Sequence, residues 1–236
     1  MAEKGYRVYD FALPMLLLHA LFTGETKNLA HWLNICPRNQ FTTLDTHDGI
    51  GVVDVRGLLT DEQIDRTKEI IYAKNPLSQK LVTTAAYKSL DIYQINCSYY
   101  SALGNNDAAY LLARAVQMFA PGIPQVYYVG MLAGENDIEL VEATKNGRDI
   151  NRHSYTVEEI SREVKRPVVR ALFNLMKFRN DFPAFQGDCT VGASGSTLNI
   201  RRVFGGHWAE LAADMKSHDF SIMYSEPGGN TKELKL

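Results

Sequence analysis

Short apolar runs alternate with longer helix-like segments through the first three quarters of the chain. Three of these runs, Tyr6–Ala12, Gln40–Leu44 and Gln125–Val129, have the length and composition of strands, and the last is almost continuously apolar. Helical spacing, capping boxes and glycine or proline stops predict helices over Met15–Thr23, Asn28–Ile35, Thr60–Ala73, Asp107–Phe119 and Arg166–Phe178. This alternation predicts an α/β fold with a parallel sheet covered by helices.

The pattern of apolar and polar residues changes after Phe182. Glycines separate runs in which apolar and polar residues alternate, such as Leu198–Phe204 and Phe220–Tyr224, and a period of two is typical of antiparallel strands. We therefore expect two domains, a helix-covered parallel sheet in residues 1–181 and a small β-domain in residues 182–236. Only about three strand–helix units precede the β-domain, whereas a closed (β/α)8 barrel needs eight. The chain is therefore either a small open sheet or the later part of a larger protein.

Composition and charge exclude several classes of partner. At 236 residues and 45% hydrophobic content the chain can bury a sizeable core, and its net charge of -2 favours neither nucleic acid nor an anionic membrane. The longest apolar run, Phe11–Leu18, is too short to cross a bilayer, and the amino-terminal segment lacks the pattern of a signal peptide. The three cysteines are scattered without metal-ligand spacing, so we expect reduced thiols, no metal site, no cofactor and a cytoplasmic location.

The segment Leu44–Gly51 carries the most informative chemistry. An apolar run ends in His47 and Asp48, and glycines follow directly. In a parallel barrel the carboxyl-terminal ends of the strands carry the working side chains, while the strands themselves are buried and rigid. A carboxylate beside an imidazole suits sugar hydroxyls, which need hydrogen-bond acceptors and donors at fixed positions. The pair could also be a solvated loop, and only its setting favours a functional site.

Five segments in order give the chain a family resemblance. They are Tyr9–Pro14, Leu44–Gly51, Leu90–Asn96, Gln125–Gly130 and Gly147–His153. Together they resemble the C-terminal half of the bacterial sucrose phosphorylases, a family in the α-amylase superfamily of retaining glycoside-active barrels. The resemblance extends from about Tyr6 to Phe185 and is weaker in the tail.

The resemblance implies a fold and a reaction. The fold would be strands six to eight of a TIM (β/α)8 barrel, followed by a small antiparallel β-domain that need not be complete. The full-length enzymes transfer a glucosyl group from sucrose to inorganic phosphate and release fructose and α-glucose 1-phosphate. They do so by retaining double displacement through an oxocarbenium-like transition state, which a further carboxylate stabilises.

Three residues match the family's sugar and phosphate contacts. Asp48 matches the carboxylate that stabilises the transition state, and His47 matches the imidazole that hydrogen-bonds the same glucosyl unit. Arg148 matches an arginine of the acceptor subsite that contacts phosphate in the second step. A guanidinium suits that role because its planar fork binds two phosphate oxygens and stays charged. The alternative for Arg148 is a surface or ion-paired arginine, since Asp149 and Arg152 lie close to it in the sequence.

The segment around Asp91, Tyr93 and Gln94 matches a family loop that alternately offers a carboxylate to fructose and a phenol to phosphate. Withdrawing a negative charge when phosphate arrives is electrostatically sensible. The other interpretation of this segment is a simple strand. Tyr127 and Tyr128 are expected to belong to the core and the barrel lining rather than to bind ligands.

Two departures from the family limit what carries over. The chain is several residues shorter between Gly51 and Thr60, so subunit contacts and loop gating there do not transfer. No segment before Tyr6 matches the strand ends that carry the family's nucleophile and acid/base. We therefore expect a fragment that is inactive alone, with a homodimer or a missing N-terminal half as partner.

Three other functions stay open. The first is a related phosphorylase acting on phosphosucrose or glucosylglycerate, although Tyr93 stands where we expect a histidine in the phosphosucrose type. The second is a glucoside hydrolase, which would not be expected to keep both the Leu90–Asn96 and the Gly147–His153 segments. The third, from a different class, is a non-catalytic sugar-binding remnant or a chain that complements a separate half.

Overall fold

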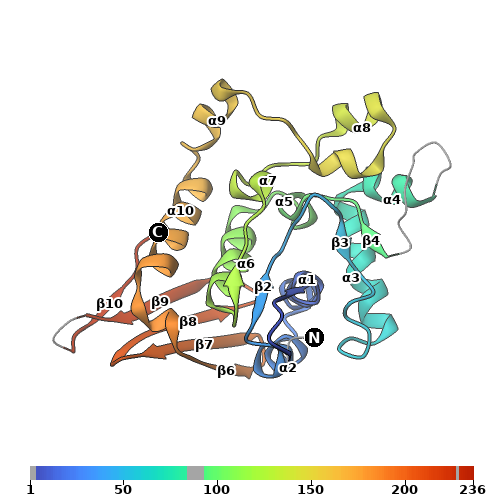
Figure 1. The fold of residues 1–236 in the computed structure, drawn as a ribbon. Helices are drawn as coiled ribbons and strands as arrows, with labels where there is room; N and C mark the ends of the chain where they lie inside the picture. Colours follow the sequence, from blue (N-terminus) through green and yellow to red (C-terminus); the bar gives the residue numbers. More distant parts are fainter. Residues whose placement is uncertain (1–3, 84–92, 227–228) are drawn as a thin grey trace.

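A three-stranded parallel sheet holds the helices of the first part of the chain together (Figure 1). The computed structural model describes residues 4–83, 93–226 and 229–236. The strands are β1 (Val8–Asp10), β2 (Gln40–Thr42) and β5 (Ile123–Pro124), in the order β1-β2-β5. The α/β class with a parallel sheet is thus confirmed, and the first two strands lie within their predicted ranges.

The third strand is not where the sequence placed it. Gln125 donates its backbone N–H to Thr42 at 2.9 Å, which extends the pairing by one residue beyond β5. The chain then turns into a short helix, so the strand predicted over Gln125–Val129 is wrong, and Tyr128 is exposed rather than buried. A short apolar run does not distinguish a buried strand from a buried helix. Here Gly130 packs against a buried ion pair, and that contact needs the turn.

Helices cover one face of the parallel sheet and continue beyond it. They are α1 (Leu13–Thr23), α2 (Lys27–Ile35), α3 (Asp61–Lys74), α4 (Pro76–Thr83), α5 (Tyr99–Ala102), α6 (Asp107–Phe119), α7 (Tyr128–Met131), α8 (Ile138–Thr144), α9 (Val157–Glu163) and α10 (Pro167–Asp181), with 3₁₀ helices η2 (Gly147–Asn151) and η3 (Pro183–Gln186). Thr60 and Thr156 each close the predicted capping box, and α6 has the predicted bounds. Among the described residues, every helix is too short or too polar to span a bilayer.

The tail forms a five-stranded antiparallel sheet, as its period of two predicts. In spatial order its strands are β10 (Thr231–Glu233), β9 (Phe220–Ser225), β8 (His207–Asp214), β7 (Thr197–Phe204) and β6 (Asp188–Ser194). Buried and partly exposed residues alternate along β7 and β8, and the buried ones join the same apolar cluster as α1 and α6. The change in secondary structure falls at Phe182, but a division into two domains stays a prediction because one core runs through both parts.

The face of the parallel sheet away from the helices is apolar and open. Tyr9, Phe41 and Ile123 are partners in adjacent strands, and Tyr9 and Ile123 are 48% and 44% exposed. Phe11 stacks on Tyr9 at 5.5 Å between ring centroids. Asp10, which points to the opposite face, is buried beneath Trp32 of α2. The uncovered side is therefore the one that faces inward when such a sheet closes into a barrel.

The three cysteines differ in burial, which gives a simple check of the packing. Burial raises the pKa of Cys36 to about 12 and that of Cys97 to about 11, whereas Cys189 is only half-buried. Because the thiolate is the nucleophile, iodoacetamide at pH 8 should alkylate Cys189 in the native chain and all three thiols after unfolding. Mass spectrometry of the labelled peptides measures this. Rapid native labelling of Cys36 or Cys97 would contradict the packing described.

Candidate active site

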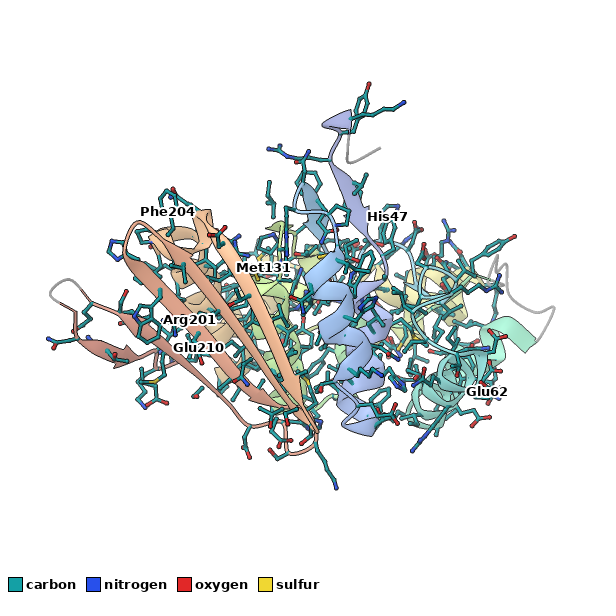
Figure 2. All side chains as sticks on the ribbon, turned by 90° about the horizontal axis from the view of Figure 1, so that it is seen from below. His47, Glu62, Met131, Arg201, Phe204 and Glu210 are labelled. Carbon is teal, nitrogen blue, oxygen red and sulfur yellow. The ribbon has the colours of Figure 1, made fainter. Side chains whose placement is uncertain are left out.

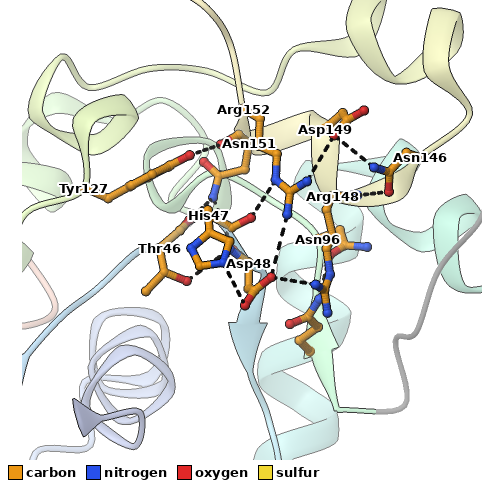
Figure 3. A network of polar contacts seen from close by, with 11 residues as sticks. Thr46, His47, Asp48, Asn96, Tyr127, Asn146, Arg148, Asp149, Asn151 and Arg152 are labelled. Carbon is orange, nitrogen blue, oxygen red and sulfur yellow. Dashed lines mark hydrogen bonds and ion pairs between the residues drawn. The ribbon is translucent and has the colours of Figure 1, made fainter.

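Three chain segments meet beyond the carboxyl-terminal ends of the parallel strands (Figure 3). The loop after β2 carries Thr46, His47 and Asp48. The 3₁₀ helix η2 and the residue after it bring Arg148 and Arg152 from the segment that follows β5. The strand pair β3 (Ile50–Gly51) and β4 (Gln94–Ile95) lies directly below the carboxylate. This is the edge where parallel barrels carry their chemistry.

Backbone contacts fix the loop that presents Asp48. Asn151 donates from Nδ2 to the carbonyl oxygens of Thr46 at 2.7 Å and of Asp48 at 3.3 Å, and the Thr46 hydroxyl accepts the Asp48 N–H at 3.1 Å. Gly49 lets β4 approach, because a Cβ at this position would lie 2.5 Å from the carbonyl oxygen of Ile95. The glycine is therefore needed for its lack of a side chain, and the loop is held from both sides.

Two arginines and a histidine lie close to the Asp48 carboxylate. Arg148 Nη1 lies 2.9 Å and Arg152 Nη2 lies 3.8 Å from Oδ1, and His47 Nε2 lies 3.6 Å from Oδ2. Asp48 is 36% and His47 69% exposed, so both side chains are accessible. Of the six residues predicted for the site, the structure brings these three together: His47, Asp48 and Arg148. An accessible carboxylate held by guanidinium groups can bind hydroxyls of a sugar and stabilise a developing positive charge.

The predicted acceptor loop is only partly described. Asp91 lies outside the described residues. Tyr93 is 61% exposed, and its carbonyl oxygen accepts the N–H of Val52 at 2.9 Å. Gln94, which pairs with Gly51 in β4, donates to the Asn96 side chain at 3.2 Å. The segment is therefore a short strand near Asp48, while an exposed Tyr93 side chain is also available to a ligand.

Arg148 is ion-paired, but with Asp48 rather than with its sequence neighbour Asp149. Asp149 instead lies 3.4 Å from Arg152 Nη1 and accepts from Asn146 at 3.0 Å. The contacts of Arg152 and Asn151 with the Asp48 loop were not predicted, although both residues belong to the Gly147–His153 segment. Side chains three positions apart lie on the same side of a 3₁₀ helix, and Arg148 and Asn151 have that spacing. Once Arg148 was assigned to the site, the spacing therefore indicated that Asn151 lies beside it.

A buried ion pair underlies the same loop and was not predicted at all. Arg114 of α6 is fully buried and donates from Nη2 to Asp45 Oδ2 at 2.5 Å and to the Tyr110 hydroxyl at 2.7 Å. Burial alone would lower the pKa of Arg114, but the charge of Asp45 and the Tyr110 hydroxyl raise it above its ordinary value. Gly130 completes the packing, since a Cβ there would lie 1.9 Å from Asp45 Oδ2. The pair anchors the chain three residues before Asp48.

Comparison with known proteins shows which proteins this chain resembles. No protein-family model matches the chain. It is 58% identical over 227 residues to the sucrose phosphorylase of Streptococcus mutans, which covers 94% of this chain and 47% of that protein. The crystal structure of sucrose 6F-phosphate phosphorylase from Thermoanaerobacter thermosaccharolyticum superposes with a TM-score of 0.87 and 39% identity over 100% of this chain and 49% of that one.

The chain is homologous to the sucrose phosphorylases. It spans about half the length of the curated relatives that it matches. The α-amylase of Geobacillus thermoleovorans, at 13% identity and a TM-score of 0.51, shares the fold over 97% of this chain. The predicted family resemblance and the predicted fold class, the later part of a TIM barrel, are thus confirmed. Among the residues that the structure describes, His, Cys, Asp and Glu side chains form no cluster that could hold a metal ion.

Proposed function

We propose that this chain supplies the stabilising and acceptor side of the active site of a sucrose phosphorylase. The complete enzyme would transfer glucosyl from sucrose to inorganic phosphate, and release fructose and α-glucose 1-phosphate by retaining double displacement. The observation that carries the proposal is the accessible Asp48 carboxylate, held beside His47 and 2.9 Å from Arg148 at the edge where parallel barrels carry their chemistry. The homology to sucrose phosphorylases supports it.

Asp48 acts on the charge that develops during glycosyl transfer. A glucosyl unit with its ring next to the carboxylate gains oxocarbenium character, and the fixed negative charge stabilises that state more than neutral sucrose. His47, which is more exposed and 3.6 Å from the carboxylate, donates a hydrogen bond to a hydroxyl of the same unit. Asn151 holds the loop, so the carboxylate does not have to reorganise during the reaction.

Arg148 binds inorganic phosphate, which accepts the glucosyl group in the second step. Inorganic phosphate brings about two negative charges close to Asp48 and needs a cation to offset the repulsion. Arg148 is partly exposed and already contacts Asp48, so it can turn part of its fork to phosphate oxygens. Tyr93 and Gln94 are proposed to bind fructose and phosphate in turn, together with Asp91, which lies outside the described residues.

Two residues of the reaction, the nucleophile and the acid/base, have no match in this chain and would come from further barrel strands. The open apolar row of Tyr9, Phe41 and Ile123 supports such strands, because closure of the barrel would bury it. They would belong to an N-terminal half or to a second chain, and a homodimer stays a prediction. We propose a cytoplasmic location, and the three unpaired cysteines support it.

Arg148→Ala should change the products rather than abolish the reaction. The test enzyme joins the first half of the Streptococcus mutans sucrose phosphorylase to this chain, and glucose 1-phosphate and free glucose are measured with sucrose and phosphate. Phosphate needs the cation and water does not, so the ratio of phosphorolysis to hydrolysis should fall by about tenfold or more.

Arg162→Ala is the matched control, because Arg162 pairs with Glu163 on α9 and is 69% exposed. Its ratio should stay at that of the unsubstituted enzyme. An unchanged ratio in the Arg148→Ala enzyme would overturn the assignment of Arg148 to phosphate. Absence of any sucrose cleavage in the folded, joined enzyme would favour a non-catalytic sugar-binding role instead.

A further inference from the structure

A groove of about 650 Å³ lies at the opposite end of the parallel sheet from Asp48. Residues at or just before the starts of the three strands line it, among them Asn39, Gln40 and Ile123. Four arginines from different parts of the chain also line it: Arg7, Arg38, Arg179 and Arg202. The only carboxylate in the lining of this groove, within the described ranges, is the exposed Asp188, so its formal charge has an excess of three positive units.

Arg179 of α10 is held rigidly at the floor of the groove. Its Nε donates to the carbonyl oxygen of Met118 at 2.8 Å and its Nη2 to that of Gly122 at 3.1 Å, so it ties α10 to the end of α6. The guanidinium carbon lies 4.6 Å from the centre of the Phe185 ring. Nη1 makes no hydrogen bond within the described part of the chain. The Arg179 guanidinium group is therefore fixed in place, and its Nη1 remains available to donate hydrogen bonds to a ligand.

Arg202 of β7 lies near the same ring. It is 5% exposed, its guanidinium carbon lies 5.9 Å from the Phe185 ring centre, and Nη2 donates to the carbonyl oxygens of Phe185 at 2.8 Å and Gly187 at 3.3 Å. Its Nε is buried and has no acceptor. A buried charged donor without a partner costs free energy, because it loses its hydration and gains no replacement.

The two inner arginines, Arg179 and Arg202, form no ion pair within the described part of the molecule. No carboxylate there lies within 4.0 Å of Arg7, Arg38, Arg179 or Arg202, although other arginines of the chain form such pairs. Burial and the neighbouring charge of Arg202 lower the pKa of Arg179 to about 10. Two like charges packed around one aromatic ring repel each other. An anion between them would offset this repulsion and accept the unused N–H groups.

We infer that this groove binds a phosphate group, either inorganic phosphate or the phosphate of a small phosphoester, at a site separate from Asp48. Arg179 and Arg202 would hold the phosphate oxygens with the guanidinium donors that their contacts to backbone carbonyls leave unused, and arginine stays charged when it binds phosphate. Arg7 and Arg38, which are bound to Asn39 and to carbonyl oxygens at the end of α2, would add positive charge at the rim. A ligand here would link α10, the start of the parallel sheet and the antiparallel sheet.

Calorimetric titration of the 236-residue chain with inorganic phosphate, at ionic strength held constant with sodium chloride, tests the site. The titration uses the Arg148→Ala chain, so that phosphate binding near Asp48 does not contribute. We expect saturable binding at one site, and Arg202→Gln in the same background should weaken it by about tenfold or more. Titrations with glucose 1-phosphate and with glucose distinguish a phosphoester from free phosphate, since glucose alone should not bind.

Arg201→Gln is the matched control. Arg201 is the neighbour of Arg202 on β7, but it pairs with Glu210 at 2.7 Å on the antiparallel sheet (Figure 2). It is not among the residues that line the groove. Phosphate affinity should stay within about twofold of the parent chain in this variant. Equal weakening by Arg201→Gln and Arg202→Gln would show a general charge effect and overturn the site.

A second readout needs no substitution at the floor of the groove, where a variant could fail to fold. Cys189 lines the groove, and phosphate should slow its alkylation by neutral iodoacetamide several-fold in the Arg148→Ala chain. The rim variants Arg7→Gln and Arg38→Gln should each reduce that protection. If phosphate produces neither saturable heat nor protection of Cys189, the groove is not a phosphate site, whatever the outcome at Arg148.

Discussion

Asp48→Asn in the joined enzyme should lower kcat for sucrose by about 10²- to 10³-fold or more while leaving the fold intact. The amide keeps the shape of the carboxylate but removes the charge that stabilises the oxocarbenium-like state. Stability should change little, because Asp48 is partly exposed and its ion pairs with Arg148 and Arg152 are accessible to water. Steady-state kinetics with sucrose and phosphate, together with a urea unfolding curve, separate the two effects.

Asp65→Asn is the control for this prediction. Asp65 is an exposed carboxylate on α3 that pairs with Lys68, and it lies outside the candidate site. Its replacement should leave kcat within about twofold, as expected for a surface pair. A kcat of the Asp48→Asn enzyme close to that of the control would show that Asp48 does not stabilise the transition state.

Asp45→Asn should destabilise the chain by about 3–5 kcal/mol, a large part of the 5–15 kcal/mol typical of a whole domain. The substitution leaves the fully buried Arg114 without its counter-charge, and its remaining neighbours, Tyr110 and Gln117, are neutral. Urea unfolding followed by circular dichroism measures the loss. The same change should displace the loop that carries Asp48, because Asp45 lies at its base.

Glu210→Gln is the matched control for the buried pair. Glu210 pairs with Arg201 on the antiparallel sheet, where both side chains are substantially exposed. Its loss should cost less than about 1 kcal/mol. A similar small cost for Asp45→Asn would mean that Arg114 finds another partner or becomes hydrated, and the buried pair would then not anchor the loop.

Local patterns predicted the elements whose causes are local. The capping boxes at Thr60 and Thr156 and the stretch Asp107–Phe119 gave helices at the expected places, because side-chain spacing and backbone capping decide them. The strand predicted over Gln125–Val129 is wrong because the cause of its conformation is not local. Its conformation is set by the contact of Gly130 with Asp45 and Arg114, which come from distant parts of the chain.

In the candidate site, too, residues with a local sequence signal were predicted and residues with a distant partner were not. His47 and Asp48 were identified by their place at the end of an apolar run, and Arg148 by its segment's resemblance to a family. Arg114 was missed, although a single cation within the apolar part of α6 is unusual enough to call for a buried partner. That partner, Asp45, lies 69 residues away in sequence. No spacing rule connects the two, so only the structure could pair them.

The central claim is that this chain holds one side of a phosphorylase site and lacks the groups that break and form bonds. The most direct measurement is glucose 1-phosphate release from sucrose and phosphate, by the chain alone and by the chain joined to the first half of the Streptococcus mutans relative. The account predicts no turnover above the uncatalysed rate for the chain alone and clear phosphorolysis for the joined enzyme. Turnover by the purified chain alone, or a folded joined enzyme without activity, would contradict it.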